Sequence, residues 1–189
     1  MEELEQSGFI SIYLPFGKKK KEKLYRLTDE YSLFYLRFIE GKIFKEKQIW
    51  EKLSQTQTYK IWSGYAFESV CLKHVPAIKK ALGIAGVYVE ASSYFKKGTK
   101  EKKGLQIDLL LDRNDHVINL FEIKFYNKIY TITKKEASEL REKKGLFQTF
   151  TKTRKQIFWS FITTFGLEQN MYSLDLQNQS LTMEDLFLE

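Results

Sequence analysis

Cysteine, histidine, proline and glycine are all scarce in this chain. Its 189 residues include one cysteine, two histidines, two prolines and ten glycines. A single cysteine, Cys71, excludes an intrachain disulfide, and with two histidines it cannot supply an ordinary structural zinc site. No stretch approaches the ~18 apolar residues of a membrane span, and the acidic residues 1–5 lack the basic start of a signal peptide. We therefore expect a reduced, cytoplasmic protein that does not enter a membrane.

Positive charge and aromatic residues are well represented. There are 31 lysines and arginines against 24 aspartates and glutamates, which gives a formal net charge of +7. Hydrophobic residues make up 43% of the chain and aromatics 15%, enough to build a core and to exclude general disorder. The basic balance agrees with a nucleic-acid partner.

The first part of the chain has the pattern of a hairpin followed by a helix. Residues 9–16 and 23–28 are typical of two strands around a basic turn, and Asp29 stands where a helix N-cap belongs. A second helical stretch covers residues 45–54. The turn holds Lys18, Lys19, Lys20 and Lys21, which form either a solvated hairpin tip or a basic wing that contacts phosphate.

The rest of the chain predicts helices and strands in the order α-β-β-β-α-β, a mixed α/β layered domain. Pro76 should end a long apolar helix and begin a short one. The expected helices span residues 59–73, 77–82 and 134–144, with a terminal turn at 183–187. The expected strands span residues 87–95, 105–111, 117–125 and 156–164, with a possible fifth at 172–176 and a hairpin turn at 112–115.

Four charged residues fall on apolar elements, where charge is expensive. Glu68 lies in the long helix, Asp108 lies between Ile107 and Leu109, and Glu122 and Lys124 share one face of the most hydrophobic strand. If the 105–111 and 117–125 strands pair through their turn, Asp108 can approach Glu122. Buried carboxylates need a cation or a shared partner. Carboxylate oxygens suit Mg²⁺, and a nearby lysine could orient water and offset charge on phosphate, so the set predicts metal-assisted phosphodiester hydrolysis. The alternative is an edge strand whose polar face forms ordinary exposed pairs.

This arrangement resembles the PD-(D/E)XK nuclease superfamily, which has the restriction-endonuclease-like fold. More closely, the chain resembles the C-terminal region of AAA-type ATP-binding proteins, in which a winged helix precedes such a nuclease-like domain. The matching stretches are Tyr25-Arg26-Leu27-Thr28-Asp29-Glu30-Tyr31, Gly64-Tyr65-Ala66-Phe67-Glu68, Gln106-Ile107-Asp108-Leu109-Leu110 and Phe121-Glu122-Ile123-Lys124-Phe125. The resemblance implies a partial winged helix over 1–45 and a restriction-endonuclease-like domain over 46–189. It also implies metal positions at Glu68, Asp108 and Glu122, with Lys124 as the catalytic lysine.

The chain departs from that pattern in three ways. Gln106 and Ile107, not proline, precede Asp108, a variation that the superfamily tolerates. No G-x-x-x-x-G-K-[ST] loop occurs, so we expect no ATP binding by this chain alone. It begins inside the expected winged helix, as a truncated piece or a gene remnant would, and its ATPase partner would lie elsewhere.

A second basic segment comes immediately before the Asp108 strand. Lys96, Lys97, Lys100, Lys102 and Lys103 either contact phosphate beside the predicted site or form a solvated loop tip. Trp62, Trp159 and the phenylalanines are expected in the core rather than as platforms for bases. Cys71 lies on an apolar row, which favours a buried, unreactive thiol.

Three functions follow from these patterns. The first is a Mg²⁺-dependent nuclease acting on DNA, with Glu68, Asp108, Glu122 and Lys124 in its site. The second is a non-catalytic nucleic-acid or protein docking module for an ATPase. The third is a stable fragment with no activity of its own.

Overall fold

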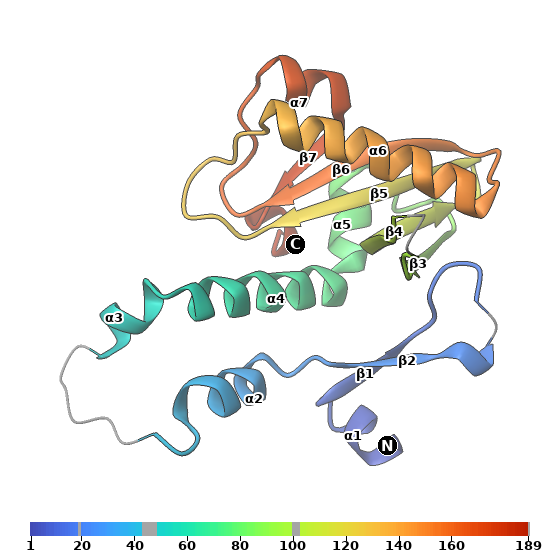
Figure 1. Ribbon diagram of the computed structural model, residues 1–189. Coiled ribbons are helices and arrows are strands. Elements are labelled where there is room, and N and C mark those ends of the chain that lie inside the picture. The colour runs from blue at the N-terminus through green and yellow to red at the C-terminus, as the bar shows by residue number, and fades with distance from the viewer. Residues whose placement is uncertain (19, 43–48, 100–102, 189) are drawn as a thin grey trace.

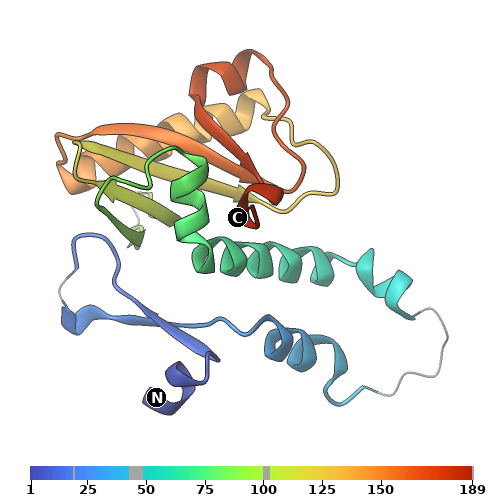
Figure 2. The same cartoon turned by 180° about the vertical axis from the view of Figure 1, so that it is seen from behind.

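A five-stranded mixed sheet carries most of the structure. This is a computed structural model (Figures 1 and 2), which describes residues 1–18, 20–42, 49–99 and 103–188. The sheet has the order β3-β4-β5-β6-β7; β3, β4 and β5 are successively antiparallel, and β5, β6 and β7 are parallel. Its strands are β3 (Val89–Lys96), β4 (Leu105–Arg113), β5 (Val117–Lys124), β6 (Gln156–Thr163) and β7 (Gln177–Thr182). The mixed α/β class predicted from the sequence is therefore confirmed.

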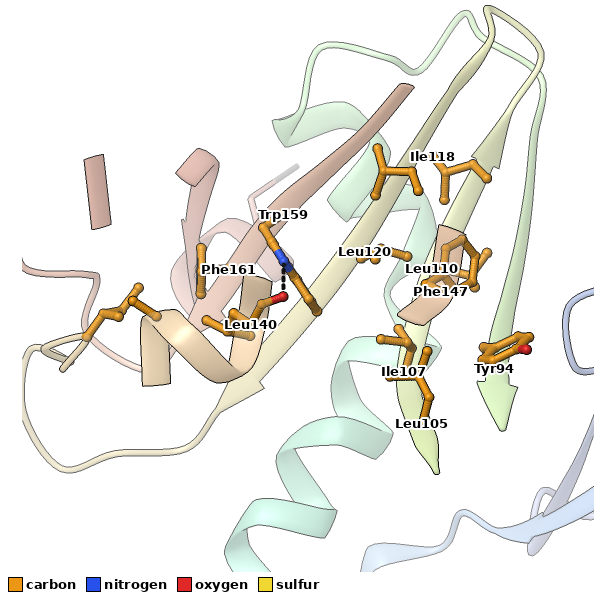
Figure 3. Packing of buried hydrophobic residues seen from close by; sticks show 13 residues of the cluster. Tyr94, Leu105, Ile107, Leu110, Ile118, Leu120, Leu140, Phe147, Trp159 and Phe161 are labelled. Atoms are coloured by element: carbon orange, nitrogen blue, oxygen red, sulfur yellow. Dashed lines mark hydrogen bonds between the residues drawn. The ribbon is translucent and has the colours of Figure 1, made fainter. Parts of the chain in front are cut away.

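Helices cover both faces of this sheet. They are α4 (Gln57–Lys73), α5 (Val75–Ala81) and the 3₁₀ turn η3 (Glu184–Leu186) on one face, and α6 (Lys134–Thr151) and α7 (Met171–Leu176) on the other. Helix α3 (Ile49–Ser54) precedes α4 and lies beyond the sheet (Figure 1). Strand side chains alternate between faces, so Leu110 and Leu120 pack toward α6, while Leu109 and Phe121 pack toward α4 and α5. Figure 3 shows the first of these clusters, in which the Trp159 indole nitrogen donates to the Leu140 carbonyl at 3.1 Å. The expected core role of Trp159 is confirmed, since it is 1% exposed.

The N-terminal segment lies along α4, on the side away from the sheet (Figures 1 and 2). It contains α1 (Glu2–Gln6), β1 (Ile10–Tyr13), the 3₁₀ turn η1 (Lys20–Glu22), β2 (Leu24–Leu27), α2 (Glu30–Phe34) and the π-helical turn η2 (Tyr35–Ile39). The predicted hairpin is confirmed as β1 and β2. The predicted Asp29 cap is also confirmed, because the Ser32 backbone N–H donates to its side chain at 2.7 Å. The Phe16 backbone N–H donates to the Ser93 backbone carbonyl at 2.7 Å and so joins this segment to β3.

Pro76 lies in the first turn of α5, and the predicted break between two helices is confirmed. The expected strand over 172–176 is wrong, because these residues belong to α7 and the strand follows it. The Asn170 side chain accepts from the backbone N–H groups of Tyr172 and Ser173 at 2.9 Å, which starts a helix there.

Two boundaries also differ from the prediction. The helix expected over 134–144 continues through Gly145 to a left-handed cap at Lys152. Asp112 and Arg113, expected in a turn, still belong to β4. Of the helix expected over 45–54, residues 49–54 form α3, and residues 45–48 lie outside the described part. Within the described residues, no helix is both long and apolar enough to cross a membrane.

Candidate active site

Helix α4 places Glu68 between the N-terminal hairpin and strands β3 and β4 of the sheet. The helix is capped by Thr56, and its residues Phe67 and Cys71 face the core. The Glu68 carboxylate forms an ion pair with Arg26 of β2 at 2.9 Å, with 19% of its side chain exposed. Burial, and then the negative charge of Asp108, raise the pKa of Glu68 even though Arg26 opposes them. The fold therefore places a carboxylate where its charge is only partly compensated.

Asp108 of β4 lies in the same cavity as Glu68. Its carboxylate accepts from Gln106 Nε2 at 2.8 Å, and it is half-buried. The pairing of β4 with β3 shifts by one residue between Ser92 and Tyr94, next to this position. Such a shift reorients the side chains around it. The cavity has a volume of about 460 Å³, and Arg26, Glu68, Gln106 and Asp108 contribute to its wall.

Glu122 and Lys124 form a separate ionic cluster at the end of β5. Glu122 pairs with Lys124 at 2.7 Å through one oxygen and with Lys143 of α6 at 3.0 Å through the other. Burial alone would raise the pKa of Glu122, but the charges of the two lysines outweigh it and lower that pKa. Burial would likewise lower the pKa of Lys124, but the charge of Glu122 raises it. The three groups line a cavity of about 140 Å³ beside Tyr130 and Glu136.

The four predicted residues thus lie in two cavities rather than in one. The last observed pair between β4 and β5 is Leu109 with Phe121, one residue short of Asp108 and Glu122. Asp108 opens into the cavity with Glu68, whereas Glu122 opens into the cavity under α6. Lys124 links the two cavities electrostatically. Its charge lowers the pKa of Glu68, and the charge of Asp108 raises the pKa of Lys124. The set is electrostatically coupled without forming a single pocket.

The two cavities differ in their suitability for a metal ion. In the part of the chain that the structure describes, no group of three histidine, cysteine, aspartate or glutamate side chains could hold one. Mg²⁺ commonly uses only one or two protein carboxylates and keeps several waters. Glu68 and Asp108 offer two carboxylates against one guanidinium, so their chemistry fits a divalent cation. Both oxygens of Glu122 already accept from ammonium groups.

The Glu122 cluster gives the protein a pH-dependent contribution to stability. Because the folded-state pKa of Glu122 is lowered, this contribution is present above the unfolded pKa and is lost as the pH falls through the folded one. We expect Glu122→Gln to lower the free energy of unfolding at pH 7 by about 1–2 kcal/mol. This value is smaller than for a fully buried ion pair, because solvent screens the partly exposed lysines. Urea denaturation of both proteins from pH 7 to pH 3 should show the difference shrinking with acidity. A difference that is constant with pH would contradict this account.

The predicted phosphate-binding lysines lie in two segments that the fold brings together. Lys18 pairs with Glu22 at 2.9 Å and Lys103 with Glu142 at 2.8 Å, while the Lys96 ammonium lies 3.9 Å from the centre of the Phe150 ring. Lys21 and Lys97 are exposed. Lys20 belongs to the η1 turn, and Lys19, Lys100 and Lys102 lie outside the described residues.

We call the concave surface between these segments the basic groove. It has a volume of about 440 Å³, and its lysines are Lys18 and Lys23 from the hairpin with Lys96 and Lys97 from the end of β3. Lys23 was not among the predicted residues, although it follows the four-lysine run directly. Arg26 and Lys143 were not predicted as site residues either. No local pattern indicates them, because their partners lie 42 and 21 residues away along the chain.

The single cysteine takes no part in either cavity. Cys71 is fully buried, as predicted, and burial raises the pKa of its thiol to about 12. A thiol with such a pKa stays protonated near neutrality and is a poor nucleophile.

Comparisons with known proteins leave the family open. No family model and no curated protein matches the chain. A crystal structure described as that of a protein of unknown function, AF1548, is similar over 62% of this chain and 64% of its own length, with 15% identity and a TM-score of 0.42. The chain therefore matches less than two thirds of that protein's length.

Proposed function

We propose that this chain is a Mg²⁺-dependent nuclease domain of the PD-(D/E)XK type, which hydrolyses phosphodiester bonds in DNA in the cytoplasm. The observation that carries the proposal is the Glu68–Asp108 cavity. Two carboxylates line it together with the Arg26 guanidinium, which pairs with Glu68, and each carboxylate interacts electrostatically with the Lys124 ammonium. The order of helix, three antiparallel strands, helix and parallel strand supports it further, since the resemblance implies that order.

In the proposed site, two carboxylates would bind the metal ion and a lysine would contact the phosphate. Asp108 and Glu68 would hold the cation, and a bound Mg²⁺ supplies an activated water and charge neutralisation. Glu122, the third predicted acidic position, lies in the other cavity and would orient Lys124 instead. Lys124 and Lys143 each pair with one oxygen of Glu122, and the Lys124 side chain is 40% exposed, so its ammonium would contact a phosphate oxygen. Arg26 holds the Glu68 carboxylate in place from the hairpin side.

The proposal is tested by a cleavage assay on the double variant Asp108→Ala, Glu122→Ala. We expect wild type to cut DNA with Mg²⁺ or Mn²⁺, and the double variant to lose that activity while its DNA binding survives. Several DNA forms should be offered as substrates. A matched control is Asp112→Ala, which removes an acidic residue of the same strand that pairs instead with Lys155. Equal cleavage by the double variant would reject the assignment.

A second candidate function is a non-catalytic docking module for nucleic acid or for a protein partner such as an ATPase. The basic groove favours it, because lysines from two distant segments line one surface. Phosphate contacts of this kind give affinity without sequence choice and weaken with salt.

The groove can be tested by replacing lysines on both of its sides. We expect Lys23→Ala, Lys96→Ala, Lys97→Ala to weaken DNA binding about 10–100-fold at low salt and to flatten the dependence of affinity on salt. The control is Lys79→Ala, Lys80→Ala, Lys152→Ala, which removes the same charge from other surfaces. Fluorescence anisotropy over a salt series measures both quantities. The same loss in the control would show that only net charge matters, and an unchanged salt slope would remove the groove as a DNA contact.

A further inference from the structure

A second cavity, which the proposed site does not use, lies between α4 and the N-terminal segment. It has a volume of about 410 Å³, within the roughly 300–1,000 Å³ usual for small-molecule sites. Its apolar wall comes from Leu33 of α2 and from Ile61, Trp62 and Tyr65 of α4. Arg26 and Arg37 add two guanidinium groups to this wall. The combination of apolar and aromatic surface with positive charge suits a flat ligand that carries an anion.

The aromatic side of this cavity is built from packed rings. The Trp62 ring packs against Phe34 at 5.2 Å and against Tyr59 at 5.5 Å between ring centres. Its Nε1 is buried and has no acceptor among the described residues. Ile61 and Tyr65 are 51% and 57% exposed and lie one helical turn apart at the rim. A base entering here would meet preformed apolar surface and would require little rearrangement.

The two arginines differ in what they already bind. Arg26 pairs with Glu68, so it connects this cavity to the candidate active site. Arg37 is exposed, and no carboxylate of the described residues forms an ion pair with its guanidinium. Arg37 is therefore the group available for an incoming phosphate. Tyr65, like Arg26, lines both cavities, so the two open beside one another.

We infer that this cavity binds one nucleotide of the DNA strand, with its base against Tyr65 and Trp62 and its phosphate at Arg37. The inference rests on the proposed function, because it makes the cavity a binding subsite for the strand whose neighbouring phosphodiester reaches Glu68 and Asp108. Base stacking on aromatic side chains is worth about 1–3 kcal/mol per base and tolerates any base. The subsite would hold the strand without selecting its sequence.

The test is calorimetric titration with deoxyadenosine monophosphate in EDTA, which separates binding from cleavage. We expect wild type to bind, and Arg37→Ala and Ile61→Glu each to bind about tenfold more weakly. Two matched controls should bind as wild type does: Arg154→Ala, at another exposed arginine, and Ile129→Glu, at an isoleucine 56% exposed outside the cavity. Arg37→Lys retains the charge and should recover part of the affinity. Circular dichroism establishes that each variant is folded.

Other ligands distinguish a nucleotide from its parts. Inorganic phosphate should bind at least about tenfold more weakly than the nucleotide, because it lacks the stacked base. Equal affinity for phosphate, equal affinity in all variants, or no binding by wild type overturns the inference. So does tighter binding of a peptide carrying aspartate and tyrosine, which would assign the cavity to a protein partner.

The failure of this inference can be told apart from the failure of the nuclease proposal. Lys124→Ala should bind the nucleotide as wild type does, because Lys124 does not line this cavity. DNA cleavage without nucleotide binding would remove the subsite and retain the nuclease. Nucleotide binding that depends on Arg37, in a protein that never cleaves DNA, would remove the nuclease and retain a nucleotide site.

Discussion

Replacing Lys124 with alanine is expected to reduce DNA cleavage about 100-fold or more while leaving DNA affinity nearly unchanged. The Lys124 ammonium lies 2.7 Å from Glu122 and interacts with both Glu68 and Asp108, so it is the charge that couples the two cavities. Its side chain is 40% exposed, which leaves it accessible to a substrate phosphate. The rate of cleavage with Mg²⁺ under single-turnover conditions measures the effect.

Lys155→Ala is the matched control for that experiment. Lys155 also forms a partly buried ion pair, with Asp112, but lines neither candidate cavity. The Lys155→Ala protein should therefore be somewhat less stable than wild type and cleave DNA at the same rate. Lys143 stays beside Glu122 in the Lys124→Ala protein, which limits the cost to folding. Cleavage at equal rates by wild type and Lys124→Ala, or by neither, would reject the catalytic assignment.

Phe147→Ala is expected to lower the free energy of unfolding by about 3–5 kcal/mol, the usual cost of deleting a large buried aromatic side chain. Phe147 of α6 is fully buried, and its ring lies 5.1 Å from Tyr94 of β3 and 5.7 Å from Phe16 between centres. It therefore connects helix, sheet and N-terminal segment. Urea denaturation of wild type and variant measures the difference.

Phe165→Ala provides the comparison for Phe147→Ala. Phe165 is 58% exposed, so its loss removes little buried apolar surface. We expect a change below about 1 kcal/mol, as for most surface substitutions. Similar losses for both variants would contradict the central position of Phe147. An unchanged slope of unfolding against urea in Phe147→Ala would further show that the variant still unfolds as a unit.

Much of the fold could be predicted because it depends on local patterns. Apolar runs in β4, β5 and β6 mark buried strands, Asp29 marks a helix start, and Pro76 marks a break between helices. The prediction failed at α7, where Asn170 caps a helix within a segment of apolar and polar residues that is equally compatible with a strand. The prediction also ended α6 at residue 144, just before Gly145. The helix continues because a glycine inside a helix costs only about 1 kcal/mol, and the packing of Phe147 outweighs that cost.

The candidate site shows where sequence patterns reach their limit. The position of charge on apolar elements singled out Glu68, Asp108, Glu122 and Lys124, because burying a charge is costly enough to require a reason. Which of them share a cavity depends on the register shift beside Asp108 and on the packing of α6 over β5. Arg26 and Lys143 belong to the site because they contact Glu68 and Glu122, which lie far from them along the chain. No periodicity in the sequence predicts such contacts.

The amino-acid order alone determined most element types outside α7, the mixed α/β class and the identity of the charged residues, because each depends on neighbours within a turn of helix or a few positions of strand. Tertiary structure alone decided the partners of those charges. It joined the hairpin lysines to the end of β3, set Arg26 between Glu68 and a second cavity, and left Arg37 without an ion-pair partner among the described residues. The physical reason is that electrostatic and packing energies depend on distances in space, which chain separation does not fix.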